Sequence, residues 1–158
     1  MRQPLVRVTV VRAEELDAAA LAAVRGVDLA GLLRWCGDVL AVPPRAVLAV
    51  RLTDDAELSR LNSGFRGVEG ATDVLAFAGD GRDRVGDIAI SVERAAAQAE
   101  VNHGDVGAEL RLLAVHGMLH CLGHDHAEAV EAAAMTAATR RLLPGETVPD
   151  LAAAATED

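Results

Sequence analysis

The chain has 158 residues and a formal net charge of −9, which suits one ordinary domain better than two. All 15 basic residues are arginines and only 2% of the residues are aromatic, so leucine, valine and alanine have to build the core. The acidic balance excludes a protein that coats nucleic acid or anionic membrane through bulk charge, although it allows a local basic site.

The absence of a membrane-spanning run and of a signal-peptide pattern indicates the cytoplasm. The sequence contains no apolar run of about 18 residues, and its first residues lack a signal-peptide pattern. We therefore expect a cytoplasmic protein that does not enter a membrane. Cys36 and Cys121 lie in apolar helical patterns and are predicted to be buried thiols, because two cysteines are too few for a disulfide framework.

Hydrophobic periodicity predicts strands and helices along the whole chain. Strand segments such as LVRVTVV alternate polar and apolar side chains, whereas helical segments repeat apolar residues at helical spacing. Residues 13–27 fit either a helical turn or an irregular connection. In chain order, the predicted elements are a strand at 5–11, a helix at 28–40, a strand at 46–52, a helix at 53–62, strands at 73–77 and 86–91, and helices at 92–102, 105–122 and 127–143.

Local signals define several boundaries. Asp28 and Ser91 can each cap the helix that follows them. The two short strands in the middle of the chain are close enough in sequence to form a hairpin. Residues 63–71 connect the helix predicted at 53–62 to the first of these strands, and they contain three glycines together with Phe65 and Arg66. This composition predicts a loop with more specialised residues than a simple connection needs.

The helix predicted at 105–122 is apolar on nearly every side from Leu112 onward. A helix without a polar face belongs in the middle of a protein. We therefore expect His116 and His120, which it carries, to be buried or to line a cleft.

The elements predict one α+β domain over residues 1–143, in which helices pack on a mixed sheet of about four strands. Residues 144–158 contain four acids and no arginine, which predicts an acidic tail that is partly disordered. This tail need not approach a functional site, and without its four charges the domain carries about −5 of the net −9.

Four of the five histidines fall in one stretch, HGMLHCLGHDH. His116 and His120 are one helical turn apart, so they share a face and can converge on one metal ion. Gly123 is placed to break the helix and let the chain turn back. Either His124 or His126 can then supply a third ligand.

Three imidazoles with an open fourth position describe a catalytic zinc site. The segment HGMLH differs from the HExxH motif of zinc proteases, because Gly117 stands where those enzymes carry the glutamate that acts as general base. Peptide hydrolysis by that route is therefore disfavoured. Cys121 points elsewhere on the helix, and Asp125, the nearest carboxylate, is expected to orient a ligating imidazole rather than to catalyse.

These motifs resemble those of the bacterial YbeY family of endoribonucleases and ribosomal RNA maturation factors. The histidine stretch resembles its HGxLHxLGxDH signature, and the LN and FRG of residues 61–67, TDVL with Phe77, and GDI at residues 86–88 resemble upstream segments in family order. The similarity covers about residues 43–143. In the wall of the substrate cleft the chain departs from the family, because Ala76 replaces the usual serine and a proline that commonly follows the phenylalanine is absent.

The resemblance implies a zincin-like fold and one Zn²⁺ per chain, bound by His116, His120 and His126. It also implies a functional role for Arg66, whose guanidinium suits a phosphodiester, and it puts His124, where the family often has tyrosine, at the pocket rim. The expected site consists of the catalytic residues Arg66 and His116, the three metal ligands His116, His120 and His126, and the surrounding residues Asp73, His124 and Asp125.

The resemblance further implies a zinc-dependent endoribonuclease specific for single strands, acting in maturation of the 16S ribosomal RNA 3′ end and in ribosome quality control. Its expected partners are single-stranded RNA, ribosomal RNA and the small ribosomal subunit with its proteins, and neither DNA nor a membrane. The alternatives are a zinc amidohydrolase or peptidase of zincin-like fold and a non-catalytic ribosome-assembly factor with a structural metal. The acidic composition predicts weak binding to free RNA, with partner contacts supplying much of the targeting.

Overall fold

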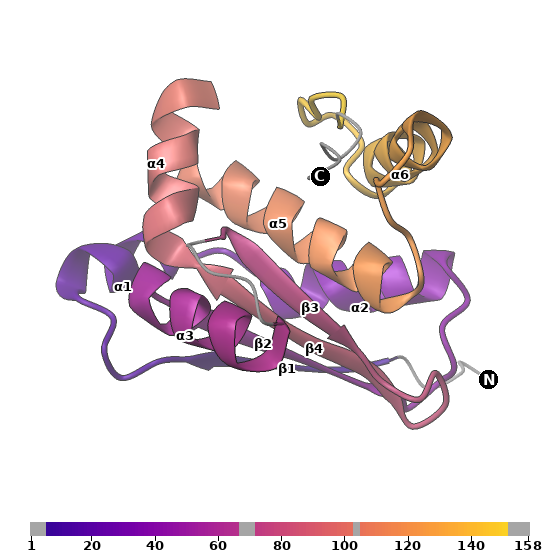
Figure 1. The fold of residues 1–158 in the computed structure, drawn as a ribbon, viewed down its shortest axis with the longest axis horizontal. Helices are drawn as coiled ribbons and strands as arrows, with labels where there is room; N and C mark the ends of the chain where they lie inside the picture. Colours follow the sequence, from indigo (N-terminus) through magenta and orange to yellow (C-terminus); the bar gives the residue numbers. More distant parts are fainter. Residues whose placement is uncertain (1–5, 67–71, 103–104, 152–158) are drawn as a thin grey trace.

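The fold is a mixed sheet with its longest helix lying across one face, as the computed structural model shows (Figure 1). The structure describes residues 6–66, 72–102 and 105–151, without the side chains of Phe65 and Arg66. Within these ranges the elements in chain order are β1 (Arg7–Arg12), α1 (Ala18–Val24), α2 (Leu29–Val39), β2 (Val47–Thr53), α3 (Asp55–Arg66), β3 (Val74–Ala78), β4 (Arg84–Ser91), α4 (Val92–Asn102), α5 (Val106–Cys121) and α6 (Ala129–Leu142).

The sheet has the strand order β1-β2-β4-β3. Strands β1, β2 and β4 run parallel, and β3 pairs antiparallel with β4. In the turn between β3 and β4, the Asp80 carboxylate accepts hydrogen bonds of 2.9 to 3.0 Å from the backbone N–H groups of residues 82–84, which stabilises the turn. The predicted hairpin and the predicted four-stranded mixed sheet are both confirmed.

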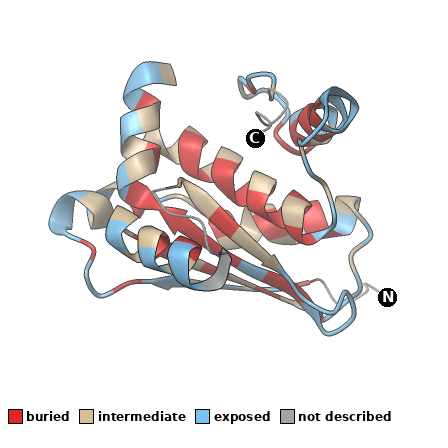
Figure 2. Ribbon diagram, in the orientation of Figure 1, coloured by how far each residue is buried: buried red, intermediate tan, exposed pale blue. Residues whose placement is uncertain are grey.

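Helix α5 forms the centre of the molecule (Figure 2). It packs against β3, β4, α2 and α4, and its residues Leu110, Val115, Met118 and Leu119 are all fully buried. From Leu112 onward, α5 carries apolar side chains on nearly every face, because other parts of the protein pack against nearly every side of it. The predicted burial of this helix is confirmed. Despite this composition, neither α5 nor any other helix in the described ranges is long and apolar enough to cross a membrane.

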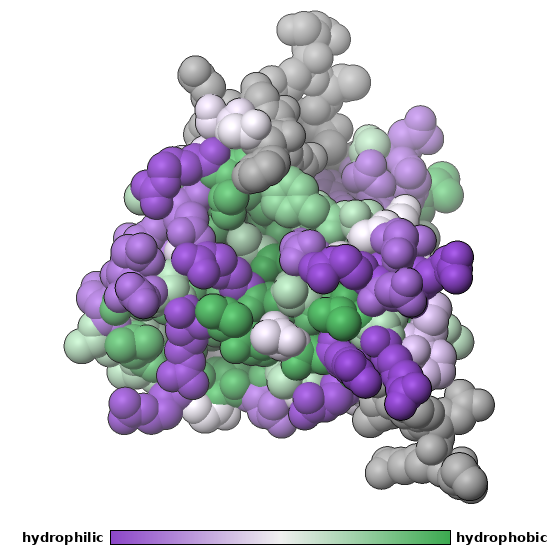
Figure 3. Space-filling view, turned by 90° about the horizontal axis from the view of Figure 1, so that it is seen from below, coloured by the Kyte–Doolittle hydropathy of each residue, from purple (hydrophilic) through white to green (hydrophobic). Residues whose placement is uncertain are grey.

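The opposite face of the sheet is covered only in part. There Leu58 of α3 packs against Leu75 and Ala89 in a small second cluster. Seen from below in Figure 3, apolar residues in green are surrounded by hydrophilic residues in purple. Val11 and Phe77 line a depression on this face, so the main core and the histidine-bearing helix belong to the other face.

Two helix caps form where the sequence predicts them. The Asp28 carboxylate accepts a hydrogen bond from the N–H of Gly31 at 2.9 Å, and the Ser91 hydroxyl accepts one from the N–H of Arg94 at 3.1 Å. Each bond satisfies a backbone donor that the first helical turn leaves without an internal partner. Helix α4 spans the predicted residues, and α2 begins directly after its predicted cap Asp28 and ends one residue before the predicted end at residue 40.

Two segments differ from the predicted elements. The undecided residues 13–27 contain α1, whose first turn is capped by the Asp17 carboxylate, which accepts a hydrogen bond from the N–H of Ala20 at 2.8 Å. Helix α3 continues to Arg66 instead of ending one turn earlier. The physical reason is that a glycine such as Gly64 costs a helix only about 1 kcal/mol, which is too little to end it.

Residues 145–151, named the strap below, fold back onto the helices. Val148 is 6% exposed and belongs to the main core. Leu151 is partly buried against the same core. The sequence distinguishes residues 144–158 by their acidity, but burial of these two apolar side chains attaches the strap to the rest of the protein.

Gly117 allows α5 to approach β4 closely. A Cβ at this position would lie 2.7 Å from Cγ2 of Ile88 and 3.1 Å from two further carbons of the same side chain. Ile88 is itself 2% exposed and packed among core residues, so it has little space into which it can move. Any side chain at position 117 therefore pushes the helix away from the sheet.

We expect Gly117→Ala to lower the free energy of unfolding by about 1–3 kcal/mol, the usual cost of an overpacked core. Gly64→Ala is the matched control, because that helical glycine has nothing within 4 Å of its Cβ position and alanine is the better helix former. Urea unfolding followed by circular dichroism measures both changes. Equal stability of the two variants would contradict the close packing of α5 on β4.

Candidate active site

The chain turns back sharply at the end of α5. Gly123 has a φ of +99°, its N–H donates to the carbonyl of His120 at 3.0 Å, and the N–H of His124 donates to the carbonyl of Leu119 at 2.9 Å. These two hydrogen bonds form a Schellman motif, whose left-handed residue favours glycine. The predicted break of the helix at Gly123 is confirmed.

All four histidines of this stretch line one cavity of about 780 Å³. The cavity lies between the second half of α5, the turn after it, β3, α6 and the end of the strap. Histidines and carboxylates form one part of its wall, and apolar side chains form the rest. The polar lining residues are Thr72, Asp73, His116, His120, His124, Asp125 and His126.

His116 is uncharged at neutral pH. Its pKa is lowered to about 4, first because burial disfavours the charged ring and then because His120 and His126 lie close to it. The Asp73 carboxylate acts in the opposite direction and attracts a proton to the ring. The neutral imidazole that results is the form that binds metal ions.

His126 lies beside His120 in the cavity. Their ring centroids are 5.6 Å apart and the ring planes meet at 65°. Within the described ranges, Nδ1 of His126 and Nε2 of His116 are buried and have no hydrogen-bond partner. A buried polar atom without a partner costs free energy, so these two nitrogens are suited to bind a ligand.

The donor chemistry fits zinc, which accepts neutral imidazole nitrogens in catalytic sites. However, among residues 6–66, 72–102 and 105–151 no group of three or more histidine, cysteine, aspartate or glutamate side chains is arranged to hold a metal ion. The histidines share a cavity without forming a closed set of ligands. The zinc site implied by the sequence therefore stays a prediction.

The two carboxylates of the cavity have different partners. Asp73, directly before β3, accepts a hydrogen bond from the side-chain amide of Gln98 at 3.1 Å, and it is close enough to His116 to influence the pKa of that ring. Asp125 accepts a hydrogen bond from the backbone N–H of His126 at 2.7 Å. This contact fixes the turn, whereas the predicted orientation of an imidazole by Asp125 stays a prediction.

Cys121 and Gly117 lie next to the cavity residues in sequence but do not line it. The Sγ atom of Cys121 is 3.8 Å from the carbonyl oxygen of Phe77, and burial raises the pKa of the thiol to about 11. Cys121 is therefore a buried thiol, as predicted, and not a thiolate ligand. The Cβ position of Gly117 meets Ile88, so the core itself excludes a glutamate of the HExxH type at this position.

Arg66 is the last residue of α3. Its side chain lies outside the described residues, so its predicted contact with a phosphodiester stays a prediction. The other end of α3 is anchored by Asp55, whose carboxylate accepts hydrogen bonds from the Ser91 hydroxyl at 2.6 Å and from the Arg94 guanidinium at 3.2 Å.

The sequence did not reveal three residues that belong to this region. Met135 of α6 and Leu151 of the strap line the cavity, and Gln98 of α4 binds Asp73. Each is distant in sequence from the histidine stretch, and no local pattern distinguishes it from its neighbours. Only the packing of α4, α6 and the strap around α5 brings these side chains together.

Fold and cavity together define an α+β protein whose buried central helix presents histidines to a cavity at its end. The protein-family model described as "Endoribonuclease YbeY" matches residues 27–145. This match covers well over half of the chain, and the chain belongs to the YbeY family.

Several curated relatives carry the name Endoribonuclease YbeY. The protein of Chloroflexus aggregans is 47% identical over 96 residues, which cover 54% of this chain and 63% of the relative. The protein of Gloeobacter violaceus is 44% identical, with 64% of this chain and 57% of the relative covered, and that of Moorella thermoacetica is 41% identical, with 66% and 75% covered. The chain thus spans less than two thirds of the length of the first two relatives.

A solved structure is similar in fold. The solution structure of TM1509 from Thermotoga maritima aligns with a TM-score of 0.58 over 86% of each chain, at 22% sequence identity. At this identity the likeness concerns the arrangement of helices and strands.

We expect His116→Leu to reduce the loss of stability between pH 7.5 and pH 4.5. An unfolded histidine titrates near 6.5, whereas folded His116 has a pKa of about 4, so in this interval the unfolded chain binds a proton that the folded chain does not. Stability is therefore lost as the pH falls, and this residue accounts for about 2 kcal/mol of the loss.

Urea unfolding of both proteins in the presence of a chelator, at the two pH values, measures the effect. The expected result is that the variant loses about 2 kcal/mol less than the wild type over this interval. If both proteins lose the same stability, the ring of His116 is not held in its neutral form by burial.

Proposed function

We propose that this chain is a zinc-dependent endoribonuclease that cleaves single-stranded RNA. The name of its relatives supports RNA cleavage. The observation that carries the proposal is the pair of buried ring nitrogens, on His116 and His126, that have no hydrogen-bond partner in the described residues and belong to one cavity. Imidazole nitrogens are the ligands that catalytic zinc sites commonly use, and these two nitrogens are available to bind an ion.

One zinc ion per chain would be held by His116, His120 and His126, in a zincin-like arrangement. When bound, zinc polarises a phosphoryl oxygen or lowers the pKa of water toward neutrality. The low pKa of His116 supports this ligand set, because it keeps the ring uncharged at neutral pH. The edge contact of the His120 and His126 rings supports His126 rather than His124 as the third ligand.

The other site residues bind and orient the substrate and the ligands. Arg66 would pair with the phosphodiester and stabilise the negative charge that develops on it. Asp73, which is itself held by Gln98, would orient His116 through its negative charge, and Asp125 would orient an imidazole of the metal site. His124, which also lines the cavity, would lie at the rim of the site and would not bind the metal.

The proposed cellular role is maturation of the 16S ribosomal RNA 3′ end and ribosome quality control in the cytoplasm, with the small ribosomal subunit as partner. The net charge of −9 supports this role, because such a protein binds free RNA weakly. Docking on a particle that already presents the RNA removes the need for a basic surface.

The contact between Gly117 and Ile88 disfavours the first alternative, a zinc amidohydrolase or peptidase. These enzymes place a general base beside the first histidine, and here that position has no space for a side chain. The second alternative, a non-catalytic assembly factor with a structural metal, makes a distinct prediction. Under it, His116→Ala lowers the melting temperature while RNA cleavage by the preparation persists.

We expect His116→Ala and Arg66→Ala each to reduce cleavage of a single-stranded RNA about 100-fold or more, the usual cost of losing an electrostatic or metal-binding group in an active site. Gel analysis of a labelled single strand of about 30 nucleotides measures the rate. Exposed Arg60, also on α3, supplies the matched control Arg60→Ala, which should cleave like the wild type.

Unchanged cleavage by both site variants would overturn the proposed function and indicate a contaminating nuclease. The same gels distinguish the two chemical routes. Attack by water leaves a linear phosphate, whereas attack by the ribose 2′-hydroxyl leaves a cyclic phosphate.

Zinc content tests the ligand set separately from activity. We expect about one zinc per chain in the wild type and in His124→Ala, and a loss of most bound zinc in His116→Ala, His120→Ala and His126→Ala, because each removes one of three protein ligands. Elemental analysis after dialysis measures the ratio. Retention of zinc by His126→Ala together with its loss by His124→Ala would reverse the assignment of the third ligand.

A further inference from the structure

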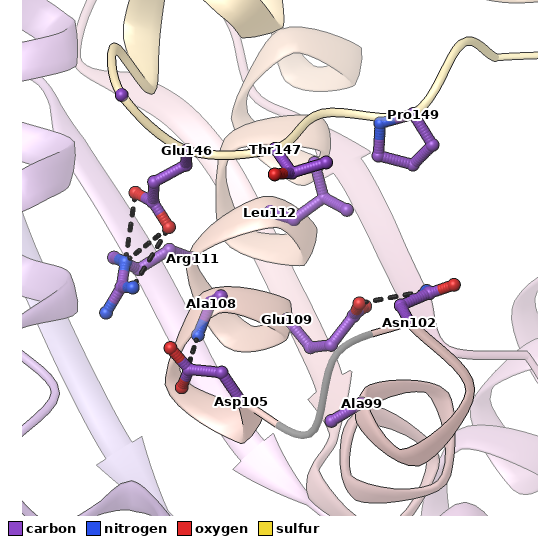
Figure 4. Close-up of a pocket in the computed structure, with 11 residues that line it drawn as sticks. Ala99, Asn102, Asp105, Ala108, Glu109, Arg111, Leu112, Glu146, Thr147 and Pro149 are labelled. Carbon is purple, nitrogen blue, oxygen red and sulfur yellow. Dashed lines mark hydrogen bonds and ion pairs between the residues drawn. The ribbon is translucent and has the colours of Figure 1, made fainter.

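The acidic residues of the strap pair with arginines of α5 and α6. Glu146 pairs with Arg111 of α5 through contacts of 2.9 to 3.1 Å, and Figure 4 shows the strap passing over α5 beside this pair. Asp150 pairs with Arg140 of α6 at 2.8 Å, and the same guanidinium donates to the carbonyl of Val148 at 3.0 Å. Both acids of the strap are therefore neutralised by arginines of the helices.

The position of Leu151 is set by a buried hydroxyl. The backbone N–H of Leu151 donates to Oγ1 of Thr136 at 3.0 Å, and that hydroxyl donates to the carbonyl of Ala132 at 2.9 Å. Thr136 is 4% exposed. A buried hydroxyl with both partners satisfied holds the backbone that binds to it in one place, so α6 determines where Leu151 lies.

Leu151 adds an apolar side chain to the wall of the histidine cavity. Leu113 of α5 and Met135 of α6 line the same cavity, and Leu151 is partly buried against the core. The cavity thus has a polar part with His116 and His120 and an apolar part to which the strap contributes. A single RNA strand has the same division, with a charged phosphodiester on one side and the apolar face of a base on the other.

We propose that Leu151 is a substrate-positioning residue, whose side chain packs against a nucleobase next to the phosphodiester at the histidines. This inference rests on the proposed function, because it takes RNA as the substrate. Every base has an apolar face, so such a contact orients the strand without selecting its sequence. The strap is then a wall of the active site rather than a passive tail.

The test compares Leu151→Ala with the wild type on short single-stranded RNAs, one intact and the others abasic at one position each. On the intact strand we expect KM to rise about fivefold with kcat nearly unchanged, because the substitution removes apolar contact area but no reacting group. On the strand that lacks the contacted base, the two proteins should have equal KM values. Leu151→Met, which keeps an apolar side chain of similar size, should restore the wild-type KM.

Two further variants make the result specific. Val130→Ala removes an 80% exposed side chain of α6 and should leave KM unchanged. Asp150→Ala removes the ion pair beside Leu151, and because that aspartate side chain is 83% exposed the fold does not depend on it. Because the Thr136 hydroxyl rather than this exposed ion pair sets the position of Leu151, Asp150→Ala should leave KM unchanged. Leu151→Val, which shortens the apolar side chain by one carbon, replaces Leu151→Ala if that variant melts below the assay temperature, and it should raise KM in the same direction.

The outcomes separate this inference from the proposed function. If the wild type cleaves RNA but Leu151→Ala matches it, or if its KM penalty is equal on every abasic strand, the positioning role is overturned and the proposed function stands. If the wild type cleaves none of the strands although its zinc content is complete, the proposed function fails and the inference fails with it.

Discussion

The close packing of α5 on the sheet is the constraint on which the rest of the structure depends. Gly117 brings the helix backbone against Ile88 of β4, so the helix is buried on nearly all sides and its side chains have to be apolar. From Leu112 onward, His116 and His120 are the exceptions, and both line the cavity at the helix end. The same contact leaves no space at position 117 for the glutamate that acts as general base in zinc proteases of the HExxH type. One steric fact therefore organises the core and restricts the chemistry of the site.

Burial of the histidine rings away from water links this packing to the chemistry of the site. Burial lowers the pKa of His116 to about 4, and it leaves two ring nitrogens without hydrogen-bond partners within the described residues. A site built in this way offers the neutral imidazole of His116 at physiological pH, and it does not depend on the charge of the whole chain. The net charge of −9 and a local site for an anionic substrate are therefore compatible. Both acids of the strap are paired with arginines of α5 and α6, so neither presents an unpaired negative charge beside the cavity.

Much of the fold and part of the site could be predicted from local patterns. Alternation and helical spacing predicted the four strands and α2 to α6, and short-range chemistry predicted the Asp28 cap, the β3–β4 hairpin and the break at Gly123. The histidine stretch predicted a shared face for His116 and His120. Where two local outcomes have similar free energies, prediction failed: residues 13–27 were left open although they contain α1, and the end of α3 was placed one turn too early.

The sequence by itself determined the elements, the buried character of α5 and the chemistry of its histidines, because these follow from interactions between residues within a few positions of one another. Only the tertiary structure decided what surrounds those histidines. The edge contact of His126 with His120, the bond from Gln98 to Asp73 and the place of Leu151 in the cavity wall all join segments that no periodicity relates. The physical reason is that burial is not directional: it attaches the strap to α5 and α6, but the shape of the assembled core decides where each side chain comes to lie.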